Sequence, residues 1–286
     1  YSQLGDARAY MSGGYDDEAS ARTYMVTQIA TTLIGLLRVD VLAHLAFSMF
    51  AATGVAYMVG QARVHGHYRW PLLALLLTPS FGVWASVVGR ESLYIGCLGF
   101  FMGALVGYFR ARGMHRLLLA MVALAGMVFI RAPFGGAMAL FFVMAWMLMR
   151  GPRVGLSLGV QMMVLLSLGA LAIVVAWPQL DAYIAGEVLP KARSYFTIYS
   201  DSTRMWINIQ TSRELFTSLW WTLPLAIVGP TPAEVYARPV MLPFLISGLT
   251  VFFLLLYAIQ QAFRCPDPIG RKILVLDDGV FQVKST

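Results

Sequence analysis

The sequence predicts an all-α membrane protein, a polytopic transmembrane helical bundle with about seven crossings, an interfacial helix and a re-entrant hairpin. Three observations lead to this fold class. Hydrophobic residues make up 59% of the 286 residues and charged residues 12%, whereas soluble domains carry about 25% charged residues. The apolar runs are long and recur along the chain, and most lack the polar face of a soluble helix. Between these runs, arginines gather in short loops.

Residues 1–40 are expected to form an outer loop and an interfacial helix. Residues 1–22 are polar and carry several acids, and the apolar run 23–37 is shorter than the ~20 residues that a crossing needs. The acids Asp16, Asp17 and Glu18 suit the first turn of that helix, because acids favour a helix N-terminus. Since Tyr1 already belongs to this loop, we expect a first membrane helix that is missing from the sequence.

The transmembrane bundle is predicted over residues 41–263. Its expected crossings are 41–60, 70–88, 93–109, 117–130, 134–149, 154–177 and 240–263. Pro79 should kink the crossing 70–88. Residues 178–215 are predicted to be a long outer loop. Residues 216–239 are predicted to be a re-entrant or surface hairpin, because their apolar run is short and prolines follow it.

The loop charges predict the topology. Linkers 61–69, 110–116 and 150–153 carry arginines and no acid, and the tail 264–286 adds further basic residues. The positive-inside rule places these segments in the cytoplasm, including the C-terminus. Topology therefore explains the net charge of +7. Because no basic tract is interleaved with aromatic residues, we expect no nucleic-acid partner.

Ionisable residues at the opposite helix tips are the candidate binding residues. Arg90, Glu91 and Arg131 lie at these tips, and Arg204 lies in the outer loop. Charges at membrane depth are costly and commonly functional. Arginine's planar fork suits phosphate oxygens, so we expect a lipid-linked phosphate or diphosphate. Alternatively, Arg90 and Glu91 neutralise each other and Arg131 snorkels to the surface.

Two further features bear on chemistry. Asp6 is the best general-base candidate in the N-terminal loop, although a solvated loop aspartate is the alternative. Asp40 and His44 share a helix face at i,i+4, which fits a local salt-bridge cluster with Arg38 or a proton relay. No GxSxG, Walker, HExxH, GxGxxG or metal-binding cysteine pattern occurs.

Three segments resemble a group of bacterial integral membrane proteins that act as polysaccharide polymerases or glycosyltransferases. The group includes Wzy-like O-antigen polymerases and exopolysaccharide polymerases, with kinship to the GT-C class. The segments are Gly5-Asp6 with Tyr10, then Pro79-Ser80 through Trp84 to Gly89-Arg90-Glu91-Ser92-Leu93, and Ile130-Arg131-Ala132-Pro133. Two departures are plain. Arg90 stands where lysine is usual, and the histidine that normally follows the Arg-Pro pair is absent.

The resemblance implies an active site at the periplasmic face of the bacterial inner membrane. Its substrates would be polyprenyl-phosphate- or diphosphate-linked sugars, with Asp6 as the base. The implied substrate-binding residues are Arg90, Glu91, Arg131, Arg204, Tyr10 and Trp84. Glu91 would orient Arg90 or contact sugar hydroxyls. No cofactor is expected; a divalent metal fits the class, but the sequence shows no ligand set for one. The expected partners are the lipid bilayer and other envelope polysaccharide assembly proteins.

Two other classes of protein are also compatible with the sequence. The sequence favours an enzyme over these two classes but does not decide between them. A transporter or flippase for lipid-linked sugars would use the same arginines without a catalytic acid. A non-catalytic scaffold of an envelope complex would need the charges at positions 90, 91 and 131 only for folding.

Overall fold

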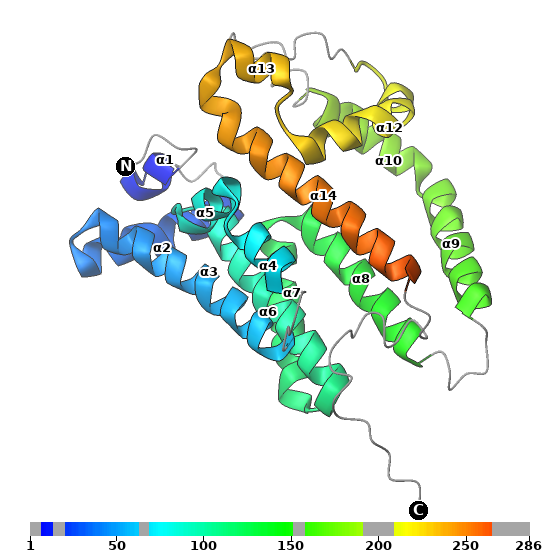
Figure 1. Cartoon of the computed structure of the whole chain (residues 1–286), viewed down its shortest axis with the longest axis horizontal. Helices are drawn as coiled ribbons and strands as arrows, with labels where there is room; N and C mark the ends of the chain where they lie inside the picture. Colours follow the sequence, from blue (N-terminus) through cyan, green and yellow to red (C-terminus); the bar gives the residue numbers. More distant parts are fainter. Residues whose placement is uncertain (1–6, 14–20, 63–68, 151–157, 191–208, 265–286) are drawn as a thin grey trace, which may run out of the picture. The chain divides into compact units, whose positions relative to one another are not determined.

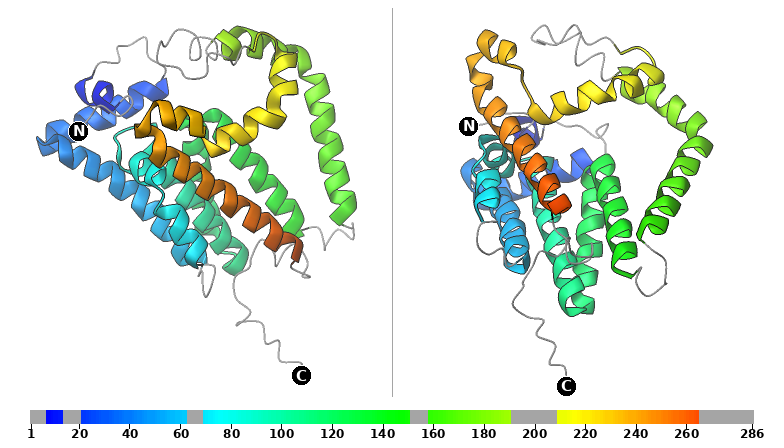
Figure 2. Two further views of the ribbon diagram at one scale, coloured as in Figure 1. Left: turned by 45° about the horizontal axis from the view of Figure 1, so that its top comes forward. Right: turned by 45° about the vertical axis from the view of Figure 1, so that its right-hand side comes forward.

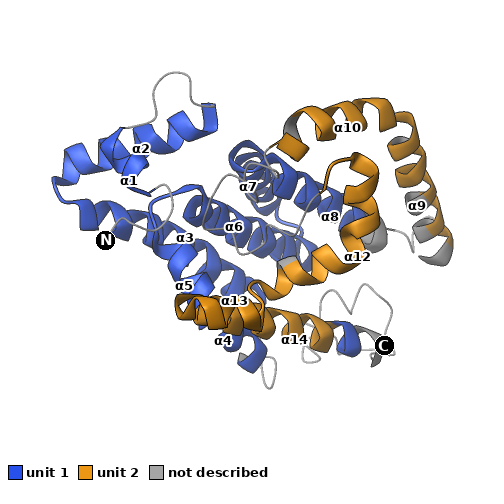
Figure 3. Ribbon diagram, turned by 90° about the horizontal axis from the view of Figure 1, so that it is seen from above, with its two compact units in different colours: residues 1–146, 259–286 blue, residues 147–258 orange. Residues whose placement is uncertain are grey.

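The computed structural model of the chain describes residues 7–13, 21–62, 69–150, 158–190 and 209–264 (Figure 1). Every regular element within these ranges is helical, as the sequence predicts. The chain divides into two compact units. Residues 1–146 and 259–286 form one unit, and residues 147–258 form the other (Figure 3).

The first unit begins with three helices, α1 (Ala7–Ser12), α2 (Ala21–Leu37) and α3 (Asp40–Ala62). The bounds of α2 match the run expected to be an interfacial helix. Apolar side chains from these helices form one core with Val88, which precedes α6 (Arg90–Ala111). The buried members of this core are Ala7, Tyr10, Val26, Ala30, Ala43, Phe47 and Val88. This core joins the N-terminal helices to the start of the bundle.

Helices α3 and α6 (Arg90–Ala111) run parallel along the centre of this unit (Figures 1 and 2). Phe50 of α3 lies against Gly96 of α6, and further along both helices Met58 lies against Gly103. Parallel neighbours require a connection that returns along the bundle. The helices α4 (Arg69–Leu76) and α5 (Pro79–Ser86) provide it.

The predicted crossing 70–88 is therefore two short helices and not one kinked helix. Helix α4 ends at Leu76, and Pro79 is the first residue of α5. Proline suits the first position of a helix, because its N–H would be unpaired there and its φ is already helical. The sequence correctly predicts a disturbance at Pro79, but the structure resolves it as a helix start.

Glycines let the backbones of α3 and α6 approach closely. A Cβ atom at Gly54 would lie 2.2 Å from the carbonyl oxygen of Gly96, and one at Gly99 would lie 2.3 Å from the carbonyl carbon of Gly54. No side chain fits at such distances. Small residues drive helix association in membranes by allowing this close packing. The contact therefore depends on glycine at both positions.

The first unit also contains α7 (Met114–Ile130) and most of α8 (Ala132–Arg150), up to Trp146. Helices α6 and α7 share a core whose buried residues are Phe101, Ala104, Leu105, Ala120, Ala123, Leu124 and Met127. Gly135 of α8 packs against α7, where a Cβ atom would lie 2.4 Å from Val128 Cα.

The second unit contains α9 (Leu158–Val175), α10 (Trp177–Tyr183), the π-helix η3 (Ile184–Val188), α12 (Ser212–Val228), α13 (Pro232–Ala237), the 3₁₀-helix η5 (Pro239–Met241) and most of α14 (Leu242–Arg264). Helical structure at α10 and η3 occupies the start of the predicted outer loop 178–215. In the predicted hairpin 216–239, α12 ends before Gly229, whose φ of +81° suits glycine, and α13 begins at Pro232. Most of the predicted tail 264–286 lies outside the described residues.

Three described helices are long and apolar enough to cross a membrane, namely Asp40–Ala62, Arg90–Ala111 and Pro239–Gln261. A fourth is added if the bent pair Ser167–Val175 and Trp177–Gly186 is one span. The predicted count of seven crossings is not confirmed. It counted apolar runs without allowing for breaks, and α7 and the apolar part of α8 are shorter than a full span.

We predict that Gly54→Ala destabilises the protein by about 1–3 kcal/mol, the usual cost of overpacking a filled interface. The added methyl group would meet the backbone of Gly96. Gly60→Ala is the matched control, because Gly60 is in the same helix and nothing lies within 4 Å of its Cβ position. Thermal unfolding in detergent measures both variants. Equal melting temperatures would contradict the proposed role of the glycine contact.

Candidate functional site

The folded chain brings separate helix tips together at one end of the first unit. The Val88 N–H donates to His44 Nδ1 (3.3 Å), and Arg131 pairs with Glu91. At the other end of α6, Arg110 donates to the carbonyl oxygen of Gln61 (2.8 Å). Within this unit, the helix tips that carry Arg90, Glu91 and Arg131 lie at one end, and the arginine-rich turns lie at the other. The distribution of charges among the loops predicts this grouping.

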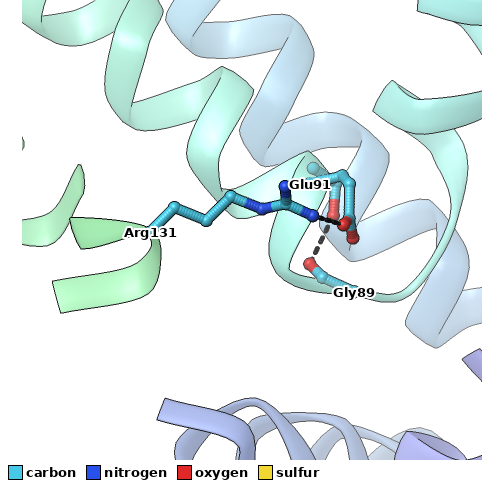
Figure 4. A network of polar contacts seen from close by, with 4 residues as sticks. Gly89, Glu91 and Arg131 are labelled. Carbon is cyan, nitrogen blue, oxygen red and sulfur yellow. Dashed lines mark hydrogen bonds and ion pairs between the residues drawn. The ribbon is translucent and has the colours of Figure 1, made fainter. Parts of the chain in front are cut away.

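The centre of the candidate site is an ion pair between Glu91 and Arg131. Arg131 Nη2 donates to Glu91 Oε1, and the side chains are 35% exposed for Arg131 and 29% exposed for Glu91 (Figure 4). Glu91 belongs to the first turn of α6, where the helix dipole favours an acid. The Arg131 guanidinium also lies 5.7 Å from the centre of the Phe134 ring, within the range of a cation–π contact.

This pairing differs from the alternative in which Arg90 and Glu91 neutralise each other and Arg131 extends to the surface. Glu91 is held by Arg131, from the turn between α7 and α8, rather than by its neighbour Arg90. Arg131 is likewise paired and does not simply extend to the surface. Arg90 is half-buried at the first position of α6. Arg90 and Glu91 thus begin α6, and Arg131 reaches Glu91 from the end of α7.

An extended connection between α5 and α6 leads directly to Arg90 and Glu91. Gly89 is fully extended (φ 171°, ψ 179°), and the Ser92 hydroxyl donates to its carbonyl oxygen (3.0 Å). A Cβ atom at Gly89 would lie 3.0 Å from Glu91 Oε2 and 4.0 Å from the Tyr10 ring. Glycine here leaves room for the Glu91 carboxylate beside the ring.

The structure places the other predicted residues in different settings. Tyr10 is 2% exposed and packs in the N-terminal core beside the site. Trp84 lies on α5 and is 39% exposed. No hydrogen bond, ion pair or ring contact within the described ranges joins it to Glu91 or Arg131. Asp6 and Arg204 lie outside the residues that the structure describes.

The expected salt-bridge cluster at the start of α3 does not form among the described residues. Arg38 adopts a left-handed conformation (φ 56°) before the helix, and Asp40 begins it. His44 instead contacts the α5–α6 connection. Ser48 does so too, since its hydroxyl lies 3.3 Å from the carbonyl oxygen of Ser86. Sequence reasoning missed Ser48, and the i,i+4 spacing of the two polar residues in an apolar run was the available signal.

Comparison with protein-family models, curated proteins and solved structures gave no match. Among the described residues there is also no group of three or more histidine, cysteine, aspartate or glutamate side chains that could hold a metal ion. The arginine fork of Arg131 is suited to an anion, and a carboxylate already occupies it.

We predict that Glu91 and Arg131 are energetically coupled by about 1 kcal/mol, since partly exposed ion pairs contribute little more than this. A double-mutant cycle with Glu91→Gln and Arg131→Gln, followed by thermal unfolding, measures the coupling. The control is a second cycle in which Arg8→Gln takes the place of Arg131→Gln, because Arg8 is exposed on α1. Additive effects of the Glu91 and Arg131 changes would show that the pair does not form.

Proposed function

We propose that this protein is a membrane glycosyltransferase or polysaccharide polymerase of the bacterial inner membrane. Its substrates would be polyprenyl-phosphate- or diphosphate-linked sugars, bound at the outer face. The observation that carries the proposal is the Glu91–Arg131 pair, formed by residues 40 positions apart at the end of the bundle opposite the arginine-rich turns. The positive-inside rule assigns the arginine-rich end to the cytoplasm and the pair to the outer face.

The site's charges fit a lipid-linked phosphate. A phosphate group carries more charge than the Glu91 carboxylate and offers more acceptor oxygens to the Arg131 fork. It can therefore replace Glu91 on Arg131, while Arg90 adds a second positive charge. Glu91 is then released to accept hydrogen bonds from sugar hydroxyls. Arg204, from the predicted outer loop, would supply a third cation in the proposed complex.

The proposed reaction forms a new glycosidic bond and releases the lipid phosphate. The acceptor hydroxyl attacks the anomeric carbon of the donor sugar, and the bond to the phosphate oxygen breaks. Asp6 would take the proton of the acceptor hydroxyl. Arg90 and Arg131 would stabilise the negative charge that develops on the leaving phosphate, which is commonly a large contribution to catalysis. A lipid-linked donor is already activated, so the reaction needs no nucleotide and no cofactor in this proposal.

A transporter or flippase for lipid-linked sugars is the second candidate, because the predicted crossing 70–88 is broken at residues 77–78. Broken helices frequently form the binding sites of transporters. The two functions differ in their need for a base. Asp6→Asn would leave lipid-linked sugar movement intact and would stop glycosyl transfer.

We predict that Arg131→Ala lowers the affinity for decaprenyl phosphate at least about tenfold, because a hydrogen bond to a charged group contributes ~1.5–3 kcal/mol. Native mass spectrometry of the purified protein with decaprenyl phosphate measures this affinity. Decaprenol, which has the same chain and no phosphate, should bind equally to wild type and variant. Arg112→Ala is the control variant, because Arg112 ends α6 at the opposite tip. Unchanged phosphate binding by Arg131→Ala would overturn the proposed site.

We also predict a loss or shortening of surface polysaccharide in cells that lack this protein. Wild type should restore the polymer, whereas Asp6→Asn and Arg131→Ala should not, because the first lacks the base and the second the phosphate contact. Electrophoretic profiles of surface polysaccharide measure this, with membrane expression checked for each variant. An unchanged profile in the deleted strain would contradict the enzymatic function. Rescue by Asp6→Asn but not by Arg131→Ala would favour the transporter.

A further inference from the structure

Two polar side chains of α3, one helical turn apart, hold the connection between α5 and α6. His44 Nδ1 accepts a hydrogen bond from the Val88 N–H (3.3 Å). The Ser48 hydroxyl lies 3.3 Å from the Ser86 carbonyl oxygen and 2.8 Å from the carbonyl oxygen of His44 in its own helix. These contacts join α3 to the segment that immediately precedes Arg90 and Glu91.

The connection needs such contacts because it is extended between two helices. Val87 (φ −88°, ψ 139°) and Gly89 (φ 171°, ψ 179°) both depart from helical backbone. Val88 between them is fully buried against Tyr10 and the rest of the N-terminal core. A buried N–H group without a partner is costly. His44 Nδ1 provides the acceptor for the Val88 N–H.

The surroundings of the second imidazole nitrogen, Nε2, indicate why the hydrogen bond to Val88 matters for the fold. When Nδ1 of a neutral histidine accepts, the proton resides on Nε2. His44 Nε2 is buried and has no hydrogen-bond partner among the residues that the structure describes. An apolar residue at this position would avoid that cost, but would leave the Val88 N–H without its acceptor. The bond to Val88 is therefore the contribution that an imidazole makes here.

We propose that His44 is the positioning residue of the candidate site. It fixes the backbone of Val88 and so sets where α6 begins and where Glu91 meets Arg131. His44 does not contact the ligand in this arrangement. It acts through the connection, and its effect on lipid-phosphate binding rests on the proposed function of the Glu91–Arg131 site.

Two substitutions separate the Nδ1 contact from the rest of the side chain. Asparagine carries its amide oxygen at the δ position, where it can replace Nδ1 as the acceptor. Glutamine carries its amide at the ε position and cannot do so without moving the connection. His44→Ala removes both groups. Ser48→Ala tests the neighbouring contact, which is on the same helix and should have the smaller effect because Val88 keeps its acceptor.

Hydrogen exchange of the full-length protein in detergent tests the contact without reference to function. We expect amide exchange in a peptide covering residues 86–93 to rise about tenfold in His44→Ala and His44→Gln, because one local hydrogen bond is lost. Exchange in His44→Asn should remain near wild type. A peptide within α7 should be unchanged in all variants, which shows that they are folded. Wild-type exchange in His44→Ala, or failure of asparagine to restore protection, would overturn the proposal.

Binding of decaprenyl phosphate then tests the positioning effect. Affinity should fall about tenfold in His44→Ala and His44→Gln and recover in His44→Asn, in the same order as the exchange rates. If exchange rises while affinity is unchanged, and Arg131→Ala still loses affinity, His44 does not position the site although the site exists. If Arg131→Ala binds like wild type, the proposed function fails, and the exchange rates alone decide whether His44 fixes the connection.

Discussion

The close packing of α3 against α6 sets the arrangement of the whole first unit. The two backbones meet at Gly54, Gly96 and Gly99, where no Cβ atom would fit. In a lipid environment, apolar side chains gain little by leaving lipid for protein, so a tight backbone contact has to supply the association. Because the two helices run parallel, the chain must return between them. The broken pair α4 and α5 makes this return and delivers Arg90 and Glu91 to the tip of the bundle.

In the proposed orientation, the charges of Glu91 and Arg131 lie at membrane depth. An isolated charge at membrane depth is costly, and pairing with an opposite charge reduces that cost. Glu91 and Arg131 pair across two helix junctions, and both stay partly exposed. The pair therefore forms within the protein itself and leaves part of each side chain exposed. The proposed replacement of Glu91 by a lipid phosphate uses this property, since the arginine changes one anionic partner for another.

The sequence predicts the helical class, the positions of α3, α6 and α14, and the placement of Glu91 and Arg131 at helix tips opposite the arginine-rich loops. These features depend on composition, on long apolar runs and on the distribution of arginines, which a single sequence displays directly. It does not predict the pairing of Glu91 with Arg131 in preference to Arg90, because that depends on how α7 ends beside α6. It likewise misses the role of His44, whose partner is a backbone N–H distant in sequence. The predicted number of crossings is not confirmed, because an apolar run does not reveal a break such as the one before Pro79.

Measuring the orientation of the bundle in the membrane is the most direct test of an outward-facing phosphate site. Cysteine labelling in intact cells makes this measurement. After replacement of Cys97 and Cys265 by alanine, one cysteine is introduced at a time, as Ala132→Cys beside the pair or as Met114→Cys at the opposite end. Both positions are exposed and neither disturbs the Glu91–Arg131 contact. We predict that a membrane-impermeant maleimide added outside labels position 132 and leaves position 114 unlabelled until the membrane is opened. Labelling of position 114 and not of position 132 would put the site on the cytoplasmic side and contradict the account.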